Sequence, residues 1–532
     1  MNLHLARPTF HHCLPYLCVL LWAVACFAFF QTAYAYHFFY QEQNQLFLLS
    51  WTYAADYLHR PAWLASLVGD FLTQFYYYRY AGPVILTGAL LILGDLVRRS
   101  LQHIGLRQGA FAVAIAVMTL FALFSLRHDY RLASIIAADG GCVAAWMCMR
   151  LLSCLPSTRL GKVLAACALF VASLLVFWML GNGGFLFVLL LILYSVTAYR
   201  RSQSVWLLVV ATLLPLSLIP LTKRVYMMNV SDILASPGIG KLSRPEWALE
   251  KDWTVDAEYS FGNWQRVVNI VEREPHPTQG QLFFYNLVMA QRGQLPFVIL
   301  RYPDNYLGTL EPVGSKTPIE TIKRMNELYW ALGDMTFCER AAMLGMVFSP
   351  DNRNARMVKR LAEANLVSGD DKAAEKYLRL LGKTWVYQSW ARGAAKDAGY
   401  RRKAQYTNRQ DTLRLTDNAH TIMSELLESN PKNTVALDYL LCSDLMLGDV
   451  NTFKRDYDRF SLPQGGRVVP LYQQALMIWL AAKQAPHDVW QQYIKMPDQL
   501  LRFEQYNQQR GSIAFKDTYW FWYDMAQKNS QL

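Results

Sequence analysis

The first 224 residues contain a series of apolar segments, each close to the length of a membrane-crossing helix. About 20 helical residues, each rising about 1.5 Å, cover a hydrocarbon layer of roughly 30 Å. The candidate segments are residues 14–35, 80–97, 109–126, 132–149, 163–180, 185–199 and 205–222. We therefore predict an all-α chain that begins with a transmembrane bundle of about seven helices in residues 1–224.

The distribution of charge follows the same division. Residues 1–224 carry six acidic and fifteen basic side chains, a net charge of +9, whereas the rest of the chain carries +3. The arginines of the first part punctuate apolar runs, whereas a nucleic-acid surface would gather them on one soluble face. The pattern favours membrane lipids as partners and argues against nucleic acid.

Lysine and arginine asymmetry between short loops predicts the orientation of the bundle. One alternating set of loops holds nine of these residues, and the other holds four, or six with Lys223 and Arg224. This places the N-terminus in the cytoplasm of a bacterial inner membrane and the C-terminal domain on the periplasmic or extracellular side. Ala33-Tyr34-Ala35 is similar to a signal-peptide cleavage site. The length of the first apolar stretch favours a retained helix, and cleavage would leave the remaining topology unchanged.

An aromatic outer loop, residues 36–79, separates the first two predicted spans. Pro61 suits the first turn of a helix. After it, apolar residues recur on one face, as in an interfacial amphipathic helix; they are Leu64, Leu67, Phe71, Leu72 and Phe75. A membrane-skimming structural loop is the simplest interpretation.

Part of this region resembles an uncharacterised family of bacterial multi-pass envelope proteins. The resemblance covers residues 42–97 and includes Glu42–Phe47, Phe71–Tyr77 and Gly82. Where the family pattern has a proline after the aromatic run, this chain has Tyr78-Arg79. The resemblance implies a multi-pass membrane protein and brings no established activity with it.

Asp139 is a candidate functional residue because charge inside a bilayer is costly. It lies within the fourth predicted span, beside Gly140 and Gly141, where small residues allow close helix packing. A functional carboxylate and a structural one that links two helices remain equally open interpretations.

A second set of polar residues is predicted to lie on the outer side of the bundle. Its carboxylates can act as bases, and its arginines can bind a lipid headgroup or a pyrophosphate. With Asp139, the candidate catalytic residues are Glu42, Asp56, Asp70 and Asp139, and the candidate ligand-binding residues are Arg60, Arg79, Arg127, His128, Asp129 and Arg131. The outline is similar to membrane glycosyltransferases that use lipid-linked sugars, although solvated loop charges would give the same pattern.

The remaining chain has the rhythm of helical repeats. A linker, residues 225–245, leads into a soluble domain, residues 246–532. In this domain a glycine followed by Asn, Gln or Asp recurs at Gly262, Gly293, Gly333, Gly369 and Gly448. Their spacings of 31, 40, 36 and 79 residues indicate a helical solenoid that resembles tetratricopeptide repeats. The rhythm breaks in residues 382–416. The stripe Tyr519–Tyr523 is predicted to form a terminal helix that packs on the last repeat.

Two functions from different classes follow from these patterns. The first is a scaffold that presents the repeats to an envelope protein or glycan, since repeats form concave binding surfaces and no nucleotide-binding, hydrolase or metalloprotease motif occurs. The second is a glycosyltransferase or phosphoglycosyltransferase that uses a lipid-linked donor. A transporter, based on Asp139 alone, is a weaker third. We predict no metal and no cofactor, and leave open whether Cys338 and Cys442 pair.

Overall fold

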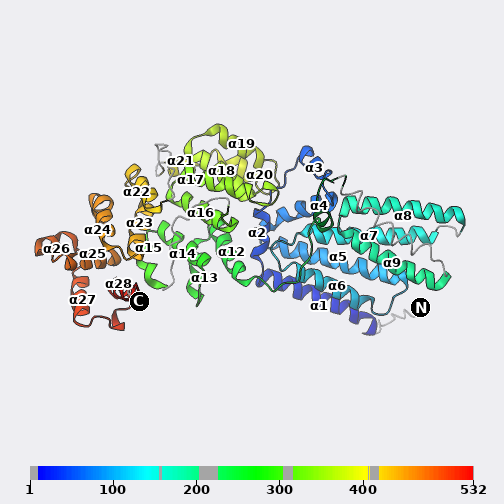
Figure 1. Cartoon of the computed structure of the whole chain (residues 1–532), viewed down its shortest axis with the longest axis horizontal. Helices are drawn as coiled ribbons and strands as arrows, with labels where there is room; N and C mark the ends of the chain where they lie inside the picture. The colour runs from blue at the N-terminus through cyan, green and yellow to red at the C-terminus, as the bar shows by residue number, and fades with distance from the viewer. Residues whose placement is uncertain are drawn as a thin grey trace, which may run out of the picture. The chain divides into compact units, whose positions relative to one another are not determined.

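A computed structural model describes residues 10–154, 158–202, 224, 226–302, 316–404, 407 and 418–530. Every regular element in these ranges is a helix, which confirms the predicted all-α class (Figure 1). The chain divides into two compact units. Unit 1 comprises Met1–Glu250 and Gly382–Gln388, and unit 2 comprises Lys251–Leu381 and Ser389–Leu532.

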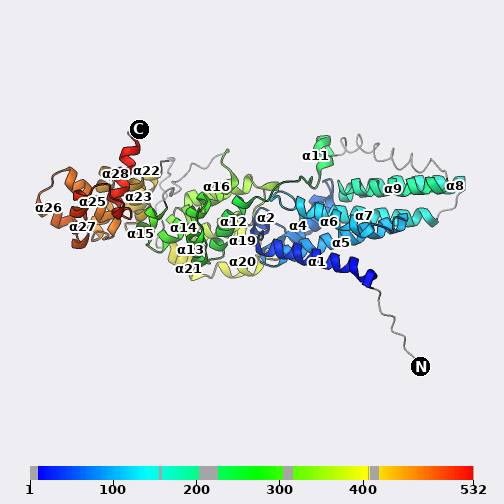
Figure 2. The same ribbon diagram turned by 90° about the horizontal axis from the view of Figure 1, so that it is seen from below.

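Unit 1 is built around a bundle of elongated helices that run lengthwise beside one another (Figure 2). They are α1 (Phe10–Thr32), α5 (Ala81–Ile104), α6 (Ala110–Phe124), α7 (Leu132–Cys154), α8 (Arg159–Leu180) and α9 (Gly183–Ser202). Four of them, α1, α5, α7 and α8, contain segments that are long and apolar enough to cross a membrane. These segments indicate that the protein associates with a membrane.

The predicted apolar segments can be compared with these helices one by one. The first six coincide with α1 and α5–α9. The apolar parts of α6 and α9 are shorter than a full span, at Ala110–Phe124 and Gly183–Thr197. The seventh predicted segment, residues 205–222, lies outside the described residues.

Small residues let α7 and α9 pack backbone to backbone. A Cβ atom at Gly141 would lie 2.2 Å from the carbonyl oxygen of Gly183, and one at Gly183 would lie 2.0 Å from that of Ala137. No side chain fits at such separations. The predicted close packing around Gly141 is therefore confirmed.

The aromatic loop folds into short helices: α2 (Tyr36–Gln43), α3 (Trp51–Tyr57), α4 (Trp63–Thr73) and the 3₁₀ helix η1 (Gln74–Tyr77). The helix predicted after Pro61 is α4. It packs against α7 through Ala65, Gly69 and Thr73, and a Cβ atom at Gly69 would lie 2.6 Å from Ala133 Cα. The apolar residues predicted to share one face are only half-buried.

The predicted linker contains α11 (Val230–Ala235) and then contacts the tight turn between α8 and α9. The Asn182 backbone N–H donates to Ser236 O at 2.8 Å, and its side-chain amide donates to Gly238 O at 2.6 Å. Ser134 Oγ donates to the same Gly238 oxygen at 3.1 Å. Residues 236–238 are thus part of unit 1.

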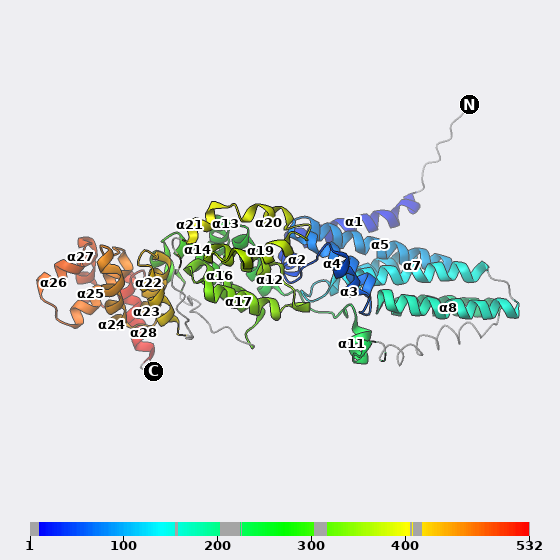
Figure 3. The ribbon, with the colours of Figure 1, turned by 90° about the horizontal axis from the view of Figure 1, so that it is seen from above.

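Unit 2 consists of shorter helices, and neighbouring ones such as α16 and α17 lie side by side (Figure 3). Its α-helices are α12 (Trp247–Ser260, which begins in unit 1), α13 (Trp264–Arg273), α14 (Gln279–Gln291), α15 (Leu295–Val298), α16 (Ile319–Leu332), α17 (Met335–Val347), α18 (Ala355–Ser368), α19 (Asp371–Leu381), α20 (Gln388–Ala394, which begins in unit 1), α21 (Ala398–Ala404), α22 (Ala419–Ser429), α23 (Thr434–Met446), α24 (Val450–Asp456), α25 (Pro470–Ala482), α26 (His487–Tyr493), α27 (Pro497–Gln508) and α28 (Tyr519–Ser530).

The five repeated glycines lie at turns between successive helices, as predicted. All five have φ between +67° and +81°. Glycine adopts this left-handed conformation without the steric cost that a Cβ atom brings, so it ends one helix and redirects the chain into the next.

Buried ion pairs connect three helices of unit 2. Arg356 of α18 forms a bidentate pair with Asp256 of α12, at 2.8 and 2.7 Å, and contacts Glu327 of α16 at 2.9 Å. Arg360 binds the other oxygen of Glu327 at 2.6 Å. Burial alone would raise the pKa of Glu327, but Arg360 and Arg356 outweigh it and hold this pKa below its usual value.

The C-terminal aromatic stripe begins α28 and packs inward, as predicted. Tyr519 and Trp520 are fully buried, and they donate to the backbone oxygens of Leu445 at 2.8 Å and Gln474 at 3.0 Å. Cys338 and Cys442 are both buried free thiols, so they do not pair with each other.

Candidate functional site

A buried carboxylate from the end of unit 1 caps helix α2. Glu250 accepts the backbone N–H of Tyr36 at 2.5 Å and that of His37 at 3.0 Å. The first N–H groups of a helix have no partner within it, and a negative charge there is favourable. Glu250 therefore holds the aromatic loop at the point where it leaves the first helix.

His37 faces the same carboxylate from within α2. Its Nδ1 lies 3.9 Å from Glu250 Oε2, and its ring packs against Tyr34 and Phe38 at centroid distances of 4.6 and 4.0 Å. Burial lowers the pKa of His37 to about 3. Burial also raises the pKa of Glu250 to about 7, although the N–H donors of α2 act in the opposite direction. Burial therefore keeps the His37 imidazole neutral, and it leaves the Glu250 carboxyl about half protonated near pH 7.

A second histidine–glutamate pair lies beside the first. His128 Nδ1 is 2.7 Å from Glu246 Oε2, and Gln41 of α2 donates to the backbone oxygen of His128 at 3.0 Å. The hydroxyl of Tyr34 donates to Leu126 O at 2.7 Å and accepts the Glu246 N–H at 3.0 Å. Residues 246–250 are thereby attached to the loop between α6 and α7.

Glu42 is buried against a segment that comes from much later in the chain. It is 2% exposed, and its Oε1 accepts the Tyr387 hydroxyl at 2.8 Å. The same segment, residues 382–388, pairs Lys383 O with the Leu49 N–H at 2.6 Å and places the Tyr387 ring 5.6 Å from that of Tyr77. We call residues 382–388 the returning segment, because they lie between α19 and α20 in sequence yet belong to unit 1.

The other two loop carboxylates have different surroundings. Asp70 accepts the Tyr57 hydroxyl at 2.8 Å, and that hydroxyl lies 2.9 Å from the hydroxyl of Tyr53. Asp56 is exposed on α3. Asp139 is buried in α7, two residues from both Ala137 and Gly141, where α7 meets α9, and its Oδ1 has no hydrogen-bond partner among the described residues. The four predicted catalytic carboxylates thus occupy four different environments.

The predicted anion-binding residues are engaged in part with their own neighbours. Arg127 binds Asp129 through two contacts of 2.8 and 2.6 Å. The Arg60 guanidinium lies 5.6 Å from the Tyr57 ring centroid. Arg79 and Arg131 are exposed. The structure therefore brings Arg127 and Asp129 together, and it places His128 with Glu246.

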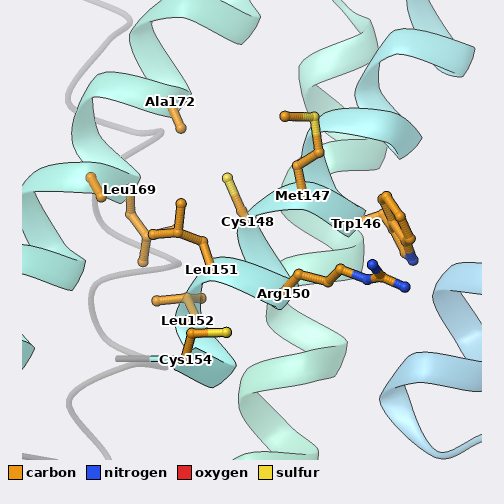
Figure 4. Close-up of a pocket in the computed structure, with 10 residues that line it drawn as sticks. Trp146, Met147, Cys148, Arg150, Leu151, Leu152, Cys154, Leu169 and Ala172 are labelled. Carbon is orange, nitrogen blue, oxygen red and sulfur yellow. The ribbon is translucent and has the colours of Figure 1, made fainter. Parts of the chain in front are cut away.

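A hollow of about 520 Å³ lies between the end of α7 that carries Cys154 and the middle of α8 (Figure 4). Ten residues line it: Trp146, Met147, Cys148, Arg150, Leu151, Leu152, Cys154, Ala168, Leu169 and Ala172. The Arg150 guanidinium stacks 4.0 Å from the Trp146 ring centroid, at one side of the hollow. These walls contain no carboxylate and no imidazole, so they suit hydrocarbon better than acid–base chemistry.

Comparison with known proteins identifies the family. A family model described as a family of unknown function (DUF6057) matches residues 11–526. The chain belongs to this family. The match covers the aromatic loop, the bundle and nearly all of unit 2, so both units are parts of a DUF6057 protein. No curated protein and no solved structure matches the chain.

Sequence reasoning did not find several residues of this DUF6057 site. Glu246, Glu250 and Tyr387 are distant in sequence from the loop that they bind, and His37 lies within the aromatic loop but was not among the candidate residues. The one available signal for the returning segment was the break in repeat rhythm after residue 382. The arrangement joins distant segments of the chain through buried acids such as Glu42 and Glu250.

Replacing Tyr387 by Phe is expected to release the returning segment. The change leaves a buried carboxylate oxygen without this donor, which costs about 1–3 kcal/mol and increases local opening roughly 5- to 150-fold. Trypsin cleavage after the exposed Lys383 should accelerate by the same factor, because cleavage follows the open population when reclosing is fast. Tyr377→Phe in α19, whose hydroxyl lies 4.0 Å from Met343 Sδ, should leave the rate unchanged. Equal cleavage of all three proteins would show that the Glu42 contact does not hold the segment.

Proposed function

We propose that this protein is a multi-pass membrane scaffold of the bacterial inner membrane. About seven spans would place the helical unit 2 outside the cytoplasm, where it would bind an envelope protein or glycan during assembly. The observation that carries the proposal is the use of Glu42: the most deeply buried of the predicted catalytic loop carboxylates binds Tyr387 of the returning segment. A carboxylate in this position holds the returning segment against the aromatic loop.

The form of unit 2 supports a binding role. Its antiparallel helix pairs turn at left-handed glycines, and helix pairs of this kind stack into solenoids with extended binding surfaces. We extend the proposal to a tetratricopeptide-like repeat. Membrane lipids are the partners of unit 1, because its apolar segments present exposed side chains such as Leu20, Leu21 and Val163.

The alternative, a transferase that uses a lipid-linked donor, needs a carboxylate that substrate can reach beside free arginine forks. Asp56 is accessible, whereas Glu42 is enclosed and Arg127 already binds Asp129. The four environments of Glu42, Asp56, Asp70 and Asp139 favour the scaffold over this enzyme.

Glu42→Gln separates the two functions. Glutamine keeps an oxygen that can accept the Tyr387 hydroxyl, but it cannot act as a general base. The scaffold predicts that Glu42→Gln complements a deletion strain as well as wild type, measured as resistance to detergent and osmotic stress. A transferase that depends on Glu42 would lose about 10²- to 10⁴-fold in rate, and failure of this variant at normal protein levels would contradict the scaffold.

Surface changes on unit 2 supply the reciprocal test. Met343 and Val347 are exposed apolar side chains one turn apart on α17, with 46% and 51% exposure. Changing both to Glu should weaken complementation without changing the protein level. The same substitution at Leu501 of α27, which is 64% exposed, controls for added charge. Full complementation by every surface variant of unit 2 would argue against a binding role for this unit.

The location of unit 2 has its own test. A cysteine added after Leu532 should react with a membrane-impermeant maleimide in intact spheroplasts, because the proposed topology places it outside the cytoplasm. A cysteine introduced in the loop after α7 should react only after permeabilisation. Reaction of the C-terminal cysteine only after permeabilisation would overturn the proposed placement.

A further inference from the structure

Three metal-ligating side chains meet in unit 2, on helices that pack consecutively (Figure 1). They are His420 in the first turn of α22, Asp444 in the last turn of α23 and Asp456 at the end of α24. One potential ligand atom from each lies within 4.8 Å of the others. The Gly448 turn brings the two carboxylates together, since it reverses the chain between α23 and α24.

Burial makes this pair of carboxylates costly. Asp456 is 1% exposed and Asp444 is 4% exposed, and Asp444 Oδ2 has no hydrogen-bond partner among the described residues. Two buried carboxylates in contact need compensating positive charge.

Arg455 supplies only part of that charge. Its Nε lies 3.2 Å from Asp456 Oδ1, which orients that carboxylate and leaves Oδ2 directed at His420 Nε2. With both carboxylates ionised, one negative charge remains beside the unpartnered oxygen of Asp444. Imidazole nitrogen together with two carboxylate oxygens is a donor set that suits divalent transition metals better than Ca²⁺ or Mg²⁺.

We propose that His420, Asp444 and Asp456 bind one divalent transition-metal ion, with Zn²⁺ as the best fit. Ligand atoms around a tetrahedral Zn²⁺ lie about 3.4 Å apart. Binding therefore separates His420 from Asp456, which are in hydrogen-bond contact in this structure, and draws in Asp444 as the third protein ligand, which leaves a fourth position for water. The imidazole is 37% exposed and gives the ion a path from solvent. Arg455 acts as the outer group that holds Asp456 in its binding orientation. The ion fastens α22, α23 and α24 together, which makes this part of unit 2 metal-dependent.

The test uses the purified full-length protein in detergent, stripped with EDTA and titrated separately with Zn²⁺, Mn²⁺, Ca²⁺ and Mg²⁺. We expect one Zn²⁺ per chain by equilibrium dialysis and a rise of at least about 4 °C in the thermal midpoint at 100 times the dissociation constant. His420→Gln and Asp444→Asn should each weaken Zn²⁺ binding roughly 100-fold. His487→Gln, at an exposed histidine of α26, should bind as wild type does.

Asp444→Asn also distinguishes two ways to compensate the buried carboxylates, a bound metal ion and a proton shared between Asp444 and Asp456. A metal site predicts that this variant is more stable than wild type without metal and gains little stability at the Zn²⁺ concentration that saturates wild type. If wild type binds no stoichiometric metal and Asp444→Asn is simply more stable, the carboxylates share a proton and the proposal is overturned. Stoichiometric binding that survives both His420→Gln and Asp444→Asn would overturn it as well, because the ion would then lie elsewhere.

Discussion

Replacing Arg356 by Met is expected to destabilise unit 2 by about 3–5 kcal/mol, because it leaves charge buried without its partner. Arg356 is 6% exposed and holds Asp256 through two hydrogen bonds. Methionine matches much of the length of the side chain but cannot compensate the carboxylate. Glu327 keeps Arg360 at 2.6 Å, so the loss falls mainly on Asp256.

The companion variant tests the reason for this loss. Removing Asp256 as well, in Arg356→Met/Asp256→Leu, takes both charges out of the interior and leaves Glu327 paired with Arg360. Buried ion pairs replaced by apolar residues of similar size are often neutral in stability. We therefore expect the double variant to recover most of the stability that Arg356→Met loses.

Hydrogen exchange in the full-length protein measures the loss of stability in the helices that the ion pairs connect. Amides of α16 and α18 should exchange roughly 150- to 5,000-fold faster in Arg356→Met than in wild type, the factor that corresponds to about 3–5 kcal/mol. Arg379→Met is the control, since Arg379 and Glu375 form an exposed pair at 3.9 Å and such pairs contribute no more than about 1 kcal/mol. Similar exchange in the two single variants would mean that the buried network contributes little.

The elements of the fold could largely be predicted from local patterns. Apolar runs located α1 and α5–α9 because a run of that length and composition is sufficient to specify a helix. Glycine at positions such as Gly369 identified the turns of unit 2, since a helix end in the left-handed conformation has a strong residue preference. Gly141 indicated close packing before its partner, Gly183, was known.

The site depends on pairings that no local pattern contains. Glu250 looks like a solvated acid in the first turn of a helix, and only the fold brings it to the start of α2. Glu42, Asp56 and Asp70 were grouped from the sequence because all three lie in the predicted outer loop, and Asp139 was added because it lies within a predicted span. Proximity to one face does not decide which way a side chain points, and Glu42, Asp56 and Asp70 face different neighbours.

His37 and Glu250 should give unit 1 opposite pH dependences that cancel in the wild type. The folded state lowers the pKa of His37 from 6.5 to about 3, so it binds fewer protons than the unfolded state between these values. The stability from neutral His37 is complete above pH 6.5 and is lost as the pH falls. Between pH 7 and 5 this loss amounts to roughly 2 kcal/mol.

Glu250 acts in the other direction. The folded state raises its pKa from 4.5 to about 7, so it binds more protons than the unfolded state in that window. Its contribution is complete below pH 4.5 and is lost as the pH rises towards 7. Acidification from pH 7 to 5 therefore recovers roughly 2 kcal/mol, which offsets the His37 loss.

Single substitutions should reveal the separate pH dependences of stability that His37 and Glu250 cause. His37→Gln leaves only the Glu250 contribution, so this variant should become more stable on going from pH 7 to 5, while Glu250→Gln should become less stable. The two variants diverge by roughly 4 kcal/mol over this range. Thermal midpoints followed by tryptophan fluorescence in detergent provide the measurement, with His59→Gln at an exposed position as the control. Other ionisable groups nearby, including His128 and Glu246, are common to all the proteins, so their effects cancel when each variant is compared with wild type at the same pH. Slopes of the same sign in the two variants would contradict the assignment, because a buried neutral base and a buried neutral acid must respond to protons in opposite directions.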